Sequence, residues 1–318
     1  MIYFIIVVAV IILILILNYL IYRRSIITTA VEIGIRFFTP FKKRNLEKQI
    51  ARKNKLIAKG YKPPKLKCNI KKEMFDGMEV YILSSNEKQS NKVIFYLYGG
   101  CYVSLPIYFH WKFLDRLVRK TGTTLILPIY PLAPECKCEE TISKVNSLYL
   151  EVCKLCNKNI ILMGDSSGGG LSILTYVNAT KNNIKKPSAM ILFSPWVDLS
   201  LTNQDAKYLI PIDPMIGLNG LVECRDVWLG DNSINDGRFN PMCADVCGIE
   251  NTYIFAGTRE LAYPDIVKFY DKCNKDNVNI NLVIVRGMNH NFVLYPMPTS
   301  LPYFNRVVKI ISEVDSEK

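Results

Sequence analysis

The sequence predicts an α/β fold, in which a mostly parallel central sheet is flanked by helices, together with an N-terminal transmembrane helix. Two observations predict it. From about Met74, short apolar runs alternate with amphipathic stretches, which is the pattern of strands and helices around a parallel sheet. Before that point, residues 2–22 form one long apolar run. We therefore expect an anchor over 2–22, a basic juxtamembrane segment over 23–73 and a folded domain over 74–318.

The apolar run has the length of a membrane-spanning helix. Its 21 residues would extend over about 31 Å, close to the roughly 30 Å hydrocarbon core of a bilayer. A cleaved signal peptide is the alternative, but it would have a basic start, a shorter apolar region and a small-residue cleavage site. Here no charged side chain precedes the run, and Arg23 and Arg24 follow it. We expect an uncleaved, single-pass membrane anchor.

The positive charge of the chain is local. The net charge is +12, and residues 42–72 alone contain thirteen Lys and Arg against one acid, Glu47. The rest of the chain therefore sums to zero. Because this stripe lies beside a membrane segment, it favours contact with anionic lipid, and we expect no nucleic-acid partner.

The expected elements of the folded domain follow one another in a regular order. The apolar runs predict strands over 80–83, 93–97, 125–129, 160–163, 189–193, 253–255 and 282–285. The amphipathic stretches predict helices over 111–119, 139–156, from Gly168 onward, and over 305–314. Residues 201–246 are rich in Pro and Asp and too long for a simple loop, so we expect an inserted lid there.

A candidate nucleophile lies where an apolar strand passes into a helix. Gly164-Asp165-Ser166-Ser167-Gly168 has the pattern of a nucleophile elbow, in which a serine is exposed on a sharp strand-to-helix turn. Glycines flank such a serine because a Cβ there would collide with the neighbouring backbone. The alternative is an ordinary Gly-rich turn, which the strand and helix on either side disfavour.

A serine nucleophile needs a base and an orienting acid. The chain has two histidines, and only His290 lies after the last predicted strand, whereas His110 precedes the serine and is expected to be a surface or packing residue. The acid should follow the penultimate strand. Glu260 comes first there, and Asp265 is the alternative.

Hydrolysis of an acyl group also needs donors for an oxyanion. Tyr98-Gly99-Gly100-Cys101 follows the strand over 93–97, so the backbone N–H groups of Gly99 and Gly100, with that of Ser167, are the expected donors. No cofactor is implied. A zinc site at Cys136, Cys138, Cys153 and Cys156 is not expected, because the helix between the two pairs would hold them roughly 25 Å apart.

These motifs together resemble the hormone-sensitive-lipase family of α/β hydrolases. The resemblance adds the segments 130–135 (Tyr-Pro-Leu-Ala-Pro-Glu) and 194–199 (Ser-Pro-Trp-Val-Asp-Leu) and covers the chain from about Val93. With the N-terminal anchor, the chain is most similar to steryl acetyl hydrolases and arylacetamide deacetylases. The resemblance implies a membrane esterase that removes acetyl or another short acyl group from a lipophilic, sterol-like or aryl ester.

The oxyanion loop departs from the family pattern, His-Gly-Gly-Gly. Tyr98 replaces the histidine and could offer its hydroxyl instead. Cys101 replaces the last glycine, and a Cβ there would cost on the order of 1 kcal/mol if φ is positive. A catalytically inactive binding protein on the same fold is therefore the alternative function, and a peptidase is a second one.

The side of the membrane on which the folded domain lies is predicted differently by two arguments. Basic residues follow the anchor, and the rule that Lys and Arg stay cytoplasmic favours the cytosol. The resemblance implies the endoplasmic reticulum membrane with the domain in the lumen, where the sequon at Asn178 would be accessible. Ten cysteines without framework spacing fit a reducing compartment. The charge rule leads us to expect the cytosolic side. The sequence does not indicate an oligomeric state.

Overall fold

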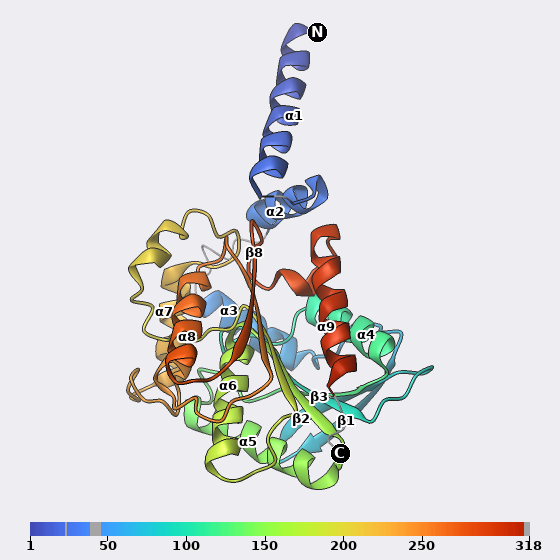
Figure 1. Cartoon of the computed structure of the whole chain (residues 1–318), viewed down its shortest axis with the longest axis vertical. Coiled ribbons are helices and arrows are strands. Elements are labelled where there is room, and N and C mark those ends of the chain that lie inside the picture. The colour runs from blue at the N-terminus through green and yellow to red at the C-terminus, as the bar shows by residue number, and fades with distance from the viewer. Residues whose placement is uncertain (23, 39–45, 315–318) are drawn as a thin grey trace.

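The computed structural model describes residues 1–22, 24–38 and 46–314 (Figure 1). Its described part contains an eight-stranded sheet in the order β1-β2-β4-β3-β5-β6-β7-β8. β1 and β2 are antiparallel to their neighbours, and all pairs from β4 to β8 are parallel. The strands are β1 (Asn69–Phe75), β2 (Met78–Ser84), β3 (Lys92–Leu97), β4 (Thr124–Pro128), β5 (Asn159–Asp165), β6 (Ala189–Phe193), β7 (Thr252–Gly257) and β8 (Ile280–Val285).

Helices cover both faces of this sheet. α4 (Tyr108–Thr121) packs beside α9 (Leu301–Glu313) on one face, and α5 (Cys138–Leu155) packs beside α6 (Ser166–Lys181) on the other. α8 (Tyr263–Lys275) follows β7 and packs against β7 and β8. Because strands covered on both faces need apolar side chains in both directions, the central strands β3, β5 and β6 are continuous apolar runs that are almost entirely buried. The α/β architecture predicted from the sequence is confirmed.

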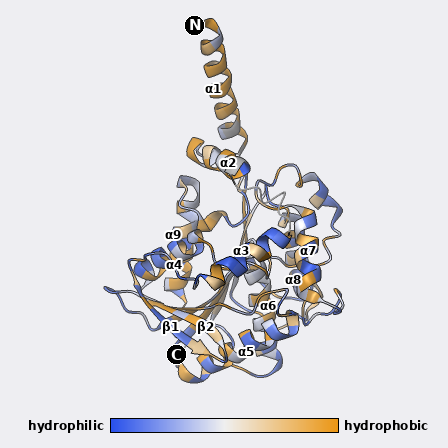
Figure 2. Ribbon diagram, turned by 180° about the vertical axis from the view of Figure 1, so that it is seen from behind, coloured by the Kyte–Doolittle hydropathy of each residue, from blue (hydrophilic) through white to orange (hydrophobic). Residues whose placement is uncertain are grey.

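The N-terminal helix α1 (Ile2–Tyr22) projects from the rest of the molecule (Figure 1). Within the described residues, one helix, Ile2–Ile21, is long and apolar enough to cross a membrane. Figure 2 shows that it is hydrophobic along most of its length, and its large apolar side chains are exposed. A signal sequence at the N-terminus has the same properties, so the anchor stays a prediction.

The segment after α1 is part of the folded domain, contrary to the expected boundary at residue 73. α2 (Ile26–Phe38) packs against the residues just before α9, and α3 (Leu46–Ala58) packs against α7 (Leu218–Leu229). Buried Lys53 of α3 donates to Ala133 O (2.9 Å) and forms an ion pair with Glu135. β1 begins at Asn69 and completes the antiparallel edge of the sheet. The basic residues 42–44, like Arg23, lie outside the described residues.

The insertion expected over 201–246 lies between β6 and β7. It contains two short 3-10 helices, Gln204–Tyr208 and Pro241–Cys243, with α7 between them. Its residues 213–224 include several that line the cavity described below. Sequence patterning missed α7 because its hydrophobic periodicity is weak.

Candidate active site

The predicted elbow is formed by the junction of β5 and α6. Ser166 is the first residue of α6 and has φ 52°, a strained value for a residue with a side chain. The turn is tight because glycines allow close backbone approach. A Cβ on Gly164 would lie 2.5 Å from Gly168 O, and a Cβ on Gly168 would lie 2.0 Å from Leu97 O. Ser166 is thereby held at the N-terminal end of a helix, whose dipole favours negative charge nearby.

His290 and Glu260 meet as the sequence predicts. Glu260 follows β7, His290 follows β8, and Glu260 Oε2 lies 2.6 Å from His290 Nδ1. The other carboxylate oxygen of Glu260 accepts from Ser194 Oγ (3.0 Å) and from the Gly257 N–H (2.7 Å). Glu260 is fully buried, so these contacts fix its orientation. The alternative acid, Asp265, accepts instead from Asn203 Nδ2 at 2.9 Å.

His290 and Asp265 both have a raised pKa, but for different physical reasons. Burial by itself would lower the pKa of His290, but its hydrogen bond to Glu260 and the negative charges of Glu260, Asp213 and Asp165 raise that pKa above the ordinary value. Burial raises the pKa of Asp265 to about 6, and the hydrogen bond from Asn203 only partly offsets this. Asp265 therefore gives up its charge more readily than an ordinary aspartate as the pH falls.

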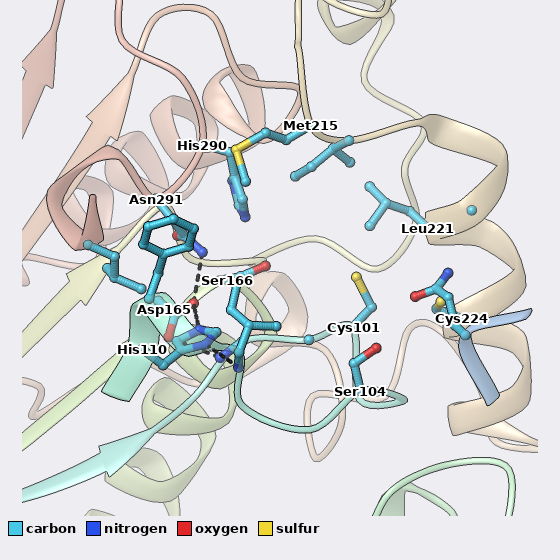
Figure 3. A pocket seen from close by; sticks show the side chains of 18 of the residues that line it. Cys101, Ser104, His110, Asp165, Ser166, Met215, Leu221, Cys224, His290 and Asn291 are labelled. Carbon is cyan, nitrogen blue, oxygen red and sulfur yellow. Dashed lines mark hydrogen bonds and ion pairs between the residues drawn. The ribbon is translucent and has the colours of Figure 1, made fainter. Parts of the chain in front are cut away.

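Ser166 and His290 line two adjoining cavities. The larger, about 110 Å³, is shown in Figure 3, and its lining includes Gly100, Cys101 and Leu221. The smaller, about 20 Å³, lies against the apolar side chains of Trp196, Val197, Leu201, Ala206, Leu218 and Leu261, with Asp265 also in its wall. The candidate nucleophile and base thus face two spaces of very different size.

Asp165, the residue before the serine, is the centre of a buried network that the sequence interpretation missed. Its Oδ1 accepts from Tyr96 OH (2.7 Å) and the Gly99 N–H (2.9 Å). Its Oδ2 accepts from Asn291 Nδ2 (2.8 Å) and lies 3.1 Å from His110 Nε2. Burial would raise the pKa of Asp165, but the proximity of His110 and these hydrogen bonds lower it.

His110 is accordingly a buried network residue and not a surface one. Its Nδ1 accepts from the Ile107 N–H at 3.0 Å, so its Nε2 carries the proton that is donated to Asp165. The network joins α4, the oxyanion loop, the elbow and the loop of His290. Two features of the sequence could have indicated this network: Asp165 lies within the motif over 164–168, and His110 is one of two histidines in the chain.

The structure of the loop over 98–101 corrects the prediction that Gly99 is an oxyanion donor. The Gly99 N–H donates to Asp165 and is therefore directed into the protein, away from an incoming oxyanion. The Gly100 N–H donates to Ser167 Oγ at 3.1 Å, and Gly100 lines the larger cavity. Ser167 is the second residue of α6, where backbone N–H groups have no partner within the helix.

The two replaced positions of this loop are both unusual. Cys101 has φ 55°, the positive value at which a side chain costs on the order of 1 kcal/mol. Tyr98 stacks on Tyr130, with ring centroids 4.4 Å apart. The Tyr98 hydroxyl is buried and has no hydrogen-bond partner within the described part of the chain, so it does not serve as the expected substitute for histidine.

Asp213, in the insertion, is a second residue that sequence reasoning missed. It is fully buried, and its carboxylate accepts from the backbone N–H groups of Met215 (2.7 Å), Ile216 (2.9 Å) and Leu261 (2.7 Å). Because Leu261 follows Glu260, Asp213 ties the insertion to the loop of the candidate acid. Burial raises the pKa of Asp213, against the opposing charge of His290.

Comparison with known families agrees with this fold. Residues 94–294, more than half of the chain, match the profile of a family described by its α/β hydrolase fold. The chain belongs to this α/β hydrolase family.

Relatives of this hydrolase include named esterases and lipases. It is 27% identical over 212 residues to an esterase of Acinetobacter venetianus, covering 66% of this chain and 70% of the relative. It is 24% identical over 225 residues to a triacylglycerol lipase of Mycobacterium tuberculosis, covering 70% of this chain and 44% of that lipase. To human hormone-sensitive lipase it is 23% identical over 192 residues, 57% of this chain and 18% of the lipase.

Solved structures share the fold of this hydrolase. A crystal structure of an esterase from the bacterial hormone-sensitive lipase family superposes with a TM-score of 0.81, covering 92% of this chain and 99% of that one, at 19% identity. An esterase/lipase from an uncultured bacterium gives a TM-score of 0.80 at 23% identity, covering 90% and 98%.

The Asp165 network predicts that His110 contributes to the stability of the folded protein. His110→Phe keeps the ring volume but removes one donor from a buried carboxylate. We expect the free energy of unfolding to fall by about 1–3 kcal/mol, measured by denaturant titration of the detergent-solubilised hydrolase. The neighbouring Tyr108→Phe, at a side chain that is 57% exposed, is the control and should change stability by less than about 0.5 kcal/mol. Equal stabilities of the two variants would contradict the network's role.

Proposed function

We propose that this hydrolase is a membrane-anchored serine carboxylic-ester hydrolase that removes a short acyl group from a lipophilic ester. The observation that carries the proposal is the pair of His290 and Glu260, 2.6 Å apart, with His290 facing the same cavities as Ser166 on its strained elbow. An elbow serine, a histidine and a buried acid are the parts of an acyl-transfer site.

The proposed reaction has two steps. Ser166 Oγ attacks the ester carbonyl while His290 Nε2 takes its proton, and Glu260 holds the Nδ1–H side of the ring and stabilises the imidazolium. His290 then gives the proton to the departing alcohol, which leaves an acyl group on Ser166. In the second step, His290 takes a proton from water as the water oxygen attacks the acyl carbon. His290 then gives that proton to Ser166 Oγ as the bond between the serine and the acyl group breaks, which releases the acid and restores the free serine.

The oxyanion donors that we propose are the backbone N–H groups of Ser167 and Gly100. Ser167 contributes from the first turn of α6, where the helix dipole adds to its hydrogen bond. Gly100 would exchange its 3.1 Å bond to Ser167 Oγ for one to the oxyanion. Because the Gly99 N–H donates to Asp165, the proposed oxyanion hole has two donors and not the three that the sequence predicts.

The cavities support a short acyl group. A space of about 20 Å³ holds little more than a single water molecule, which is also the scale of one methyl group. We assign the acyl chain, acetyl in the simplest case, to this apolar space beside Ser166. The larger cavity, with Leu105, Phe109 and Leu294 in its wall, would then take the lipophilic alcohol.

The N-terminal region supports a location at a membrane. The exposed side chains of α2 include Ile26 (56%), Ile27 (59%) and Ile33 (48%), which continue the apolar surface of α1. We propose that α1 spans the bilayer and holds the site near dissolved lipid esters, as the resemblance to steryl acetyl hydrolases and arylacetamide deacetylases implies. The endoplasmic reticulum is the membrane that this resemblance favours.

The first test is covalent labelling together with an ester panel. A fluorophosphonate should label Ser166, and acetyl esters of lipophilic alcohols should be cleaved faster than butyryl esters and far faster than long-chain esters. Ser166→Ala should abolish labelling and lower kcat by roughly 10⁴- to 10⁶-fold with the fold unchanged.

The outcomes of this test separate the alternatives. A wild-type protein that neither takes the label nor cleaves any ester would instead support the inactive binding protein. Labelling with a preference for long acyl chains would retain the serine mechanism and reject the assignment of the small cavity.

The identity of the acid can be tested by pH dependence. His290 must be neutral to accept a proton, so activity is present above its pKa and is lost as the pH falls through it. Since that pKa is raised, we expect the acid limb of kcat/KM to have its midpoint above about 6.5. Glu260→Gln removes the charge that raises the pKa, so the midpoint should fall, and kcat should drop by about 10²- to 10⁴-fold.

Asp265→Asn is the matched control for this experiment. It should leave the midpoint in place and lower kcat by less than about tenfold, because Asp265 contacts Asn203 and not His290. A larger loss in Asp265→Asn than in Glu260→Gln would show that the alternative acid is the correct one.

Topology is tested by protease protection of sealed microsomes that contain the full chain. From the charge rule we expect the folded domain to be digested by external protease without detergent, because Lys and Arg beside the span stay cytoplasmic. A domain that survives until detergent is added would be lumenal, as in the resemblance, and the charge rule would have failed here.

A further inference from the structure

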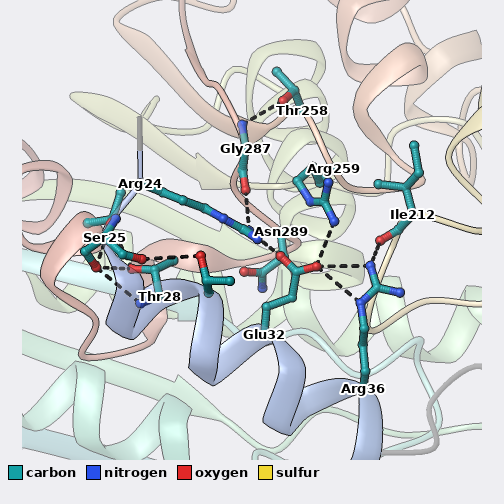
Figure 4. A network of polar contacts seen from close by, with 12 residues as sticks. Arg24, Ser25, Thr28, Glu32, Arg36, Ile212, Thr258, Arg259, Gly287 and Asn289 are labelled. Atoms are coloured by element: carbon teal, nitrogen blue, oxygen red, sulfur yellow. Dashed lines mark hydrogen bonds and ion pairs between the residues drawn. The ribbon is translucent and has the colours of Figure 1, made fainter. Parts of the chain in front are cut away.

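A buried glutamate on α2 is surrounded by three arginines. The Glu32 side chain is 4% exposed and pairs with Arg24, Arg36 (3.0 Å) and Arg259 (2.8 Å). Figure 4 shows these side chains meeting between α2 and the loops of the hydrolase domain. We call these four residues the Glu32 cluster. Arg24 and Arg36 come from the segment beside the anchor, whereas Arg259 lies more than 220 positions away in the chain.

Two arginines of the cluster reach the loops that carry the candidate base and acid. Arg259 directly precedes Glu260, and its backbone N–H donates to Met288 O at 3.0 Å, two positions before His290. Arg24 Nη1 donates to Gly287 O at 2.9 Å. Because Glu32 accepts from both arginines, a single carboxylate holds the Glu260 loop and the His290 loop from outside.

The third arginine reaches the insertion. Arg36 donates to Ile212 O, and the adjacent Asp213 accepts from the Leu261 N–H at 2.7 Å. The Glu260 loop is therefore held on both sides of Glu260, directly through Arg259 and indirectly through Asp213. In contrast, a helix that acted only as a spacer would need no contact with these loops.

The electrostatics make Glu32 the member on which the others depend. Burial would raise the pKa of Glu32, but the hydrogen bonds and charges of Arg259 and Arg24 lower it, so the carboxylate is charged. The side chains of Arg24 and Arg259 are 3% and 15% exposed. Removal of this negative charge would take the carboxylate partner away from both arginines and would loosen the positions in which Glu32 holds them.

We propose that Glu32 is a positioning residue for ester hydrolysis, which holds the Glu260 and His290 loops in register through Arg259 and Arg24. The inference rests on the proposed roles of Glu260 and His290. It makes α2 a working part of the hydrolase and not a linker between the anchor and the domain.

The test compares Glu32→Gln with Thr28→Val in the full chain. Thr28 lies one turn earlier on α2, is also buried, and contacts Thr299 Oγ1 (2.7 Å) without touching either loop. Thr28→Val therefore weakens the docking of the same helix by another route. All rates are divided by the amount of serine that a fluorophosphonate titrates, so that unfolded protein does not count.

For Glu32→Gln we expect kcat to fall by about 10- to 100-fold with KM changed less than threefold, because misplacement of catalytic groups by a fraction of an ångström has effects of this size. The acid-limb midpoint should also move to lower pH. His290 faces Glu260, Asp213 and Asp165, all of which raise its pKa. The Glu32 cluster holds the segments that carry Glu260 and Asp213, so loosening it weakens their effect on that pKa. Thr28→Val should retain the wild-type kcat per titrated serine and the wild-type midpoint.

Glu32→Asp keeps the charge on a shorter side chain and serves as the variant that folds if Glu32→Gln does not. It should give a loss of kcat between those of wild type and Glu32→Gln. Wild-type kcat and midpoint in Glu32→Asp and in any folded Glu32→Gln would overturn the inference, as would an equal loss in Thr28→Val. If the wild-type chain itself neither takes the label nor cleaves esters, the proposed function fails and the inference falls with it.

Discussion

The arrangement of the site depends on one buried carboxylate, that of Asp165. A buried charge is tolerated only where hydrogen bonds replace the water it has lost, and Asp165 has four such partners from three parts of the chain. Those partners fix where the oxyanion loop, α4 and the His290 loop lie relative to the elbow. Ser166 can hold its strained backbone conformation because the residue before it is held on all sides. The same carboxylate also accepts the Gly99 N–H, so this group is not free to bind an oxyanion. The contacts that support the elbow therefore also limit which N–H groups of the loop over 98–101 are candidate oxyanion donors.

The parts of the site that could be predicted were those with a local signal. Apolar runs located the seven strands from β2 to β8, most directly β3, β5 and β6, because a strand buried on both faces is apolar along its length. The Gly-flanked Ser166 stood out because a tight strand-to-helix turn excludes a Cβ at particular positions. His290 and Glu260 followed from chain order, since successive parallel strands deliver their carboxyl ends to the same edge of the sheet.

The rest required contacts between residues far apart in the chain. Neither composition nor periodicity shows that the Gly99 N–H faces Asp165, that Asp213 reaches Leu261, or that Glu32 pairs with Arg259. The contacts of the basic segment with the folded domain could not be predicted for the same reason. Its charge suggested a membrane-facing stripe, but Lys53 is buried against Glu135, and β1 pairs along its whole length with β2. A charged residue in a sequence does not reveal whether its partner is lipid, water or another side chain.

The position of α2 connects α1 with the loops of the candidate active site. α2 lies between α1 and the end of the sheet at which β8 leads to His290 (Figure 1). Its outer face exposes isoleucines, and its inner face carries Glu32. The ion pairs of Glu32 hold α2 against the loops of Glu260 and His290, because α2 cannot move away from those loops without breaking buried charge pairs. In the proposed function, in which α1 spans the bilayer, a lipophilic ester would reach a site whose geometry is set by the helix that follows the membrane span. In the same proposal, the small acyl space and the larger alcohol space suit an ester with a short acyl group and a bulky apolar alcohol.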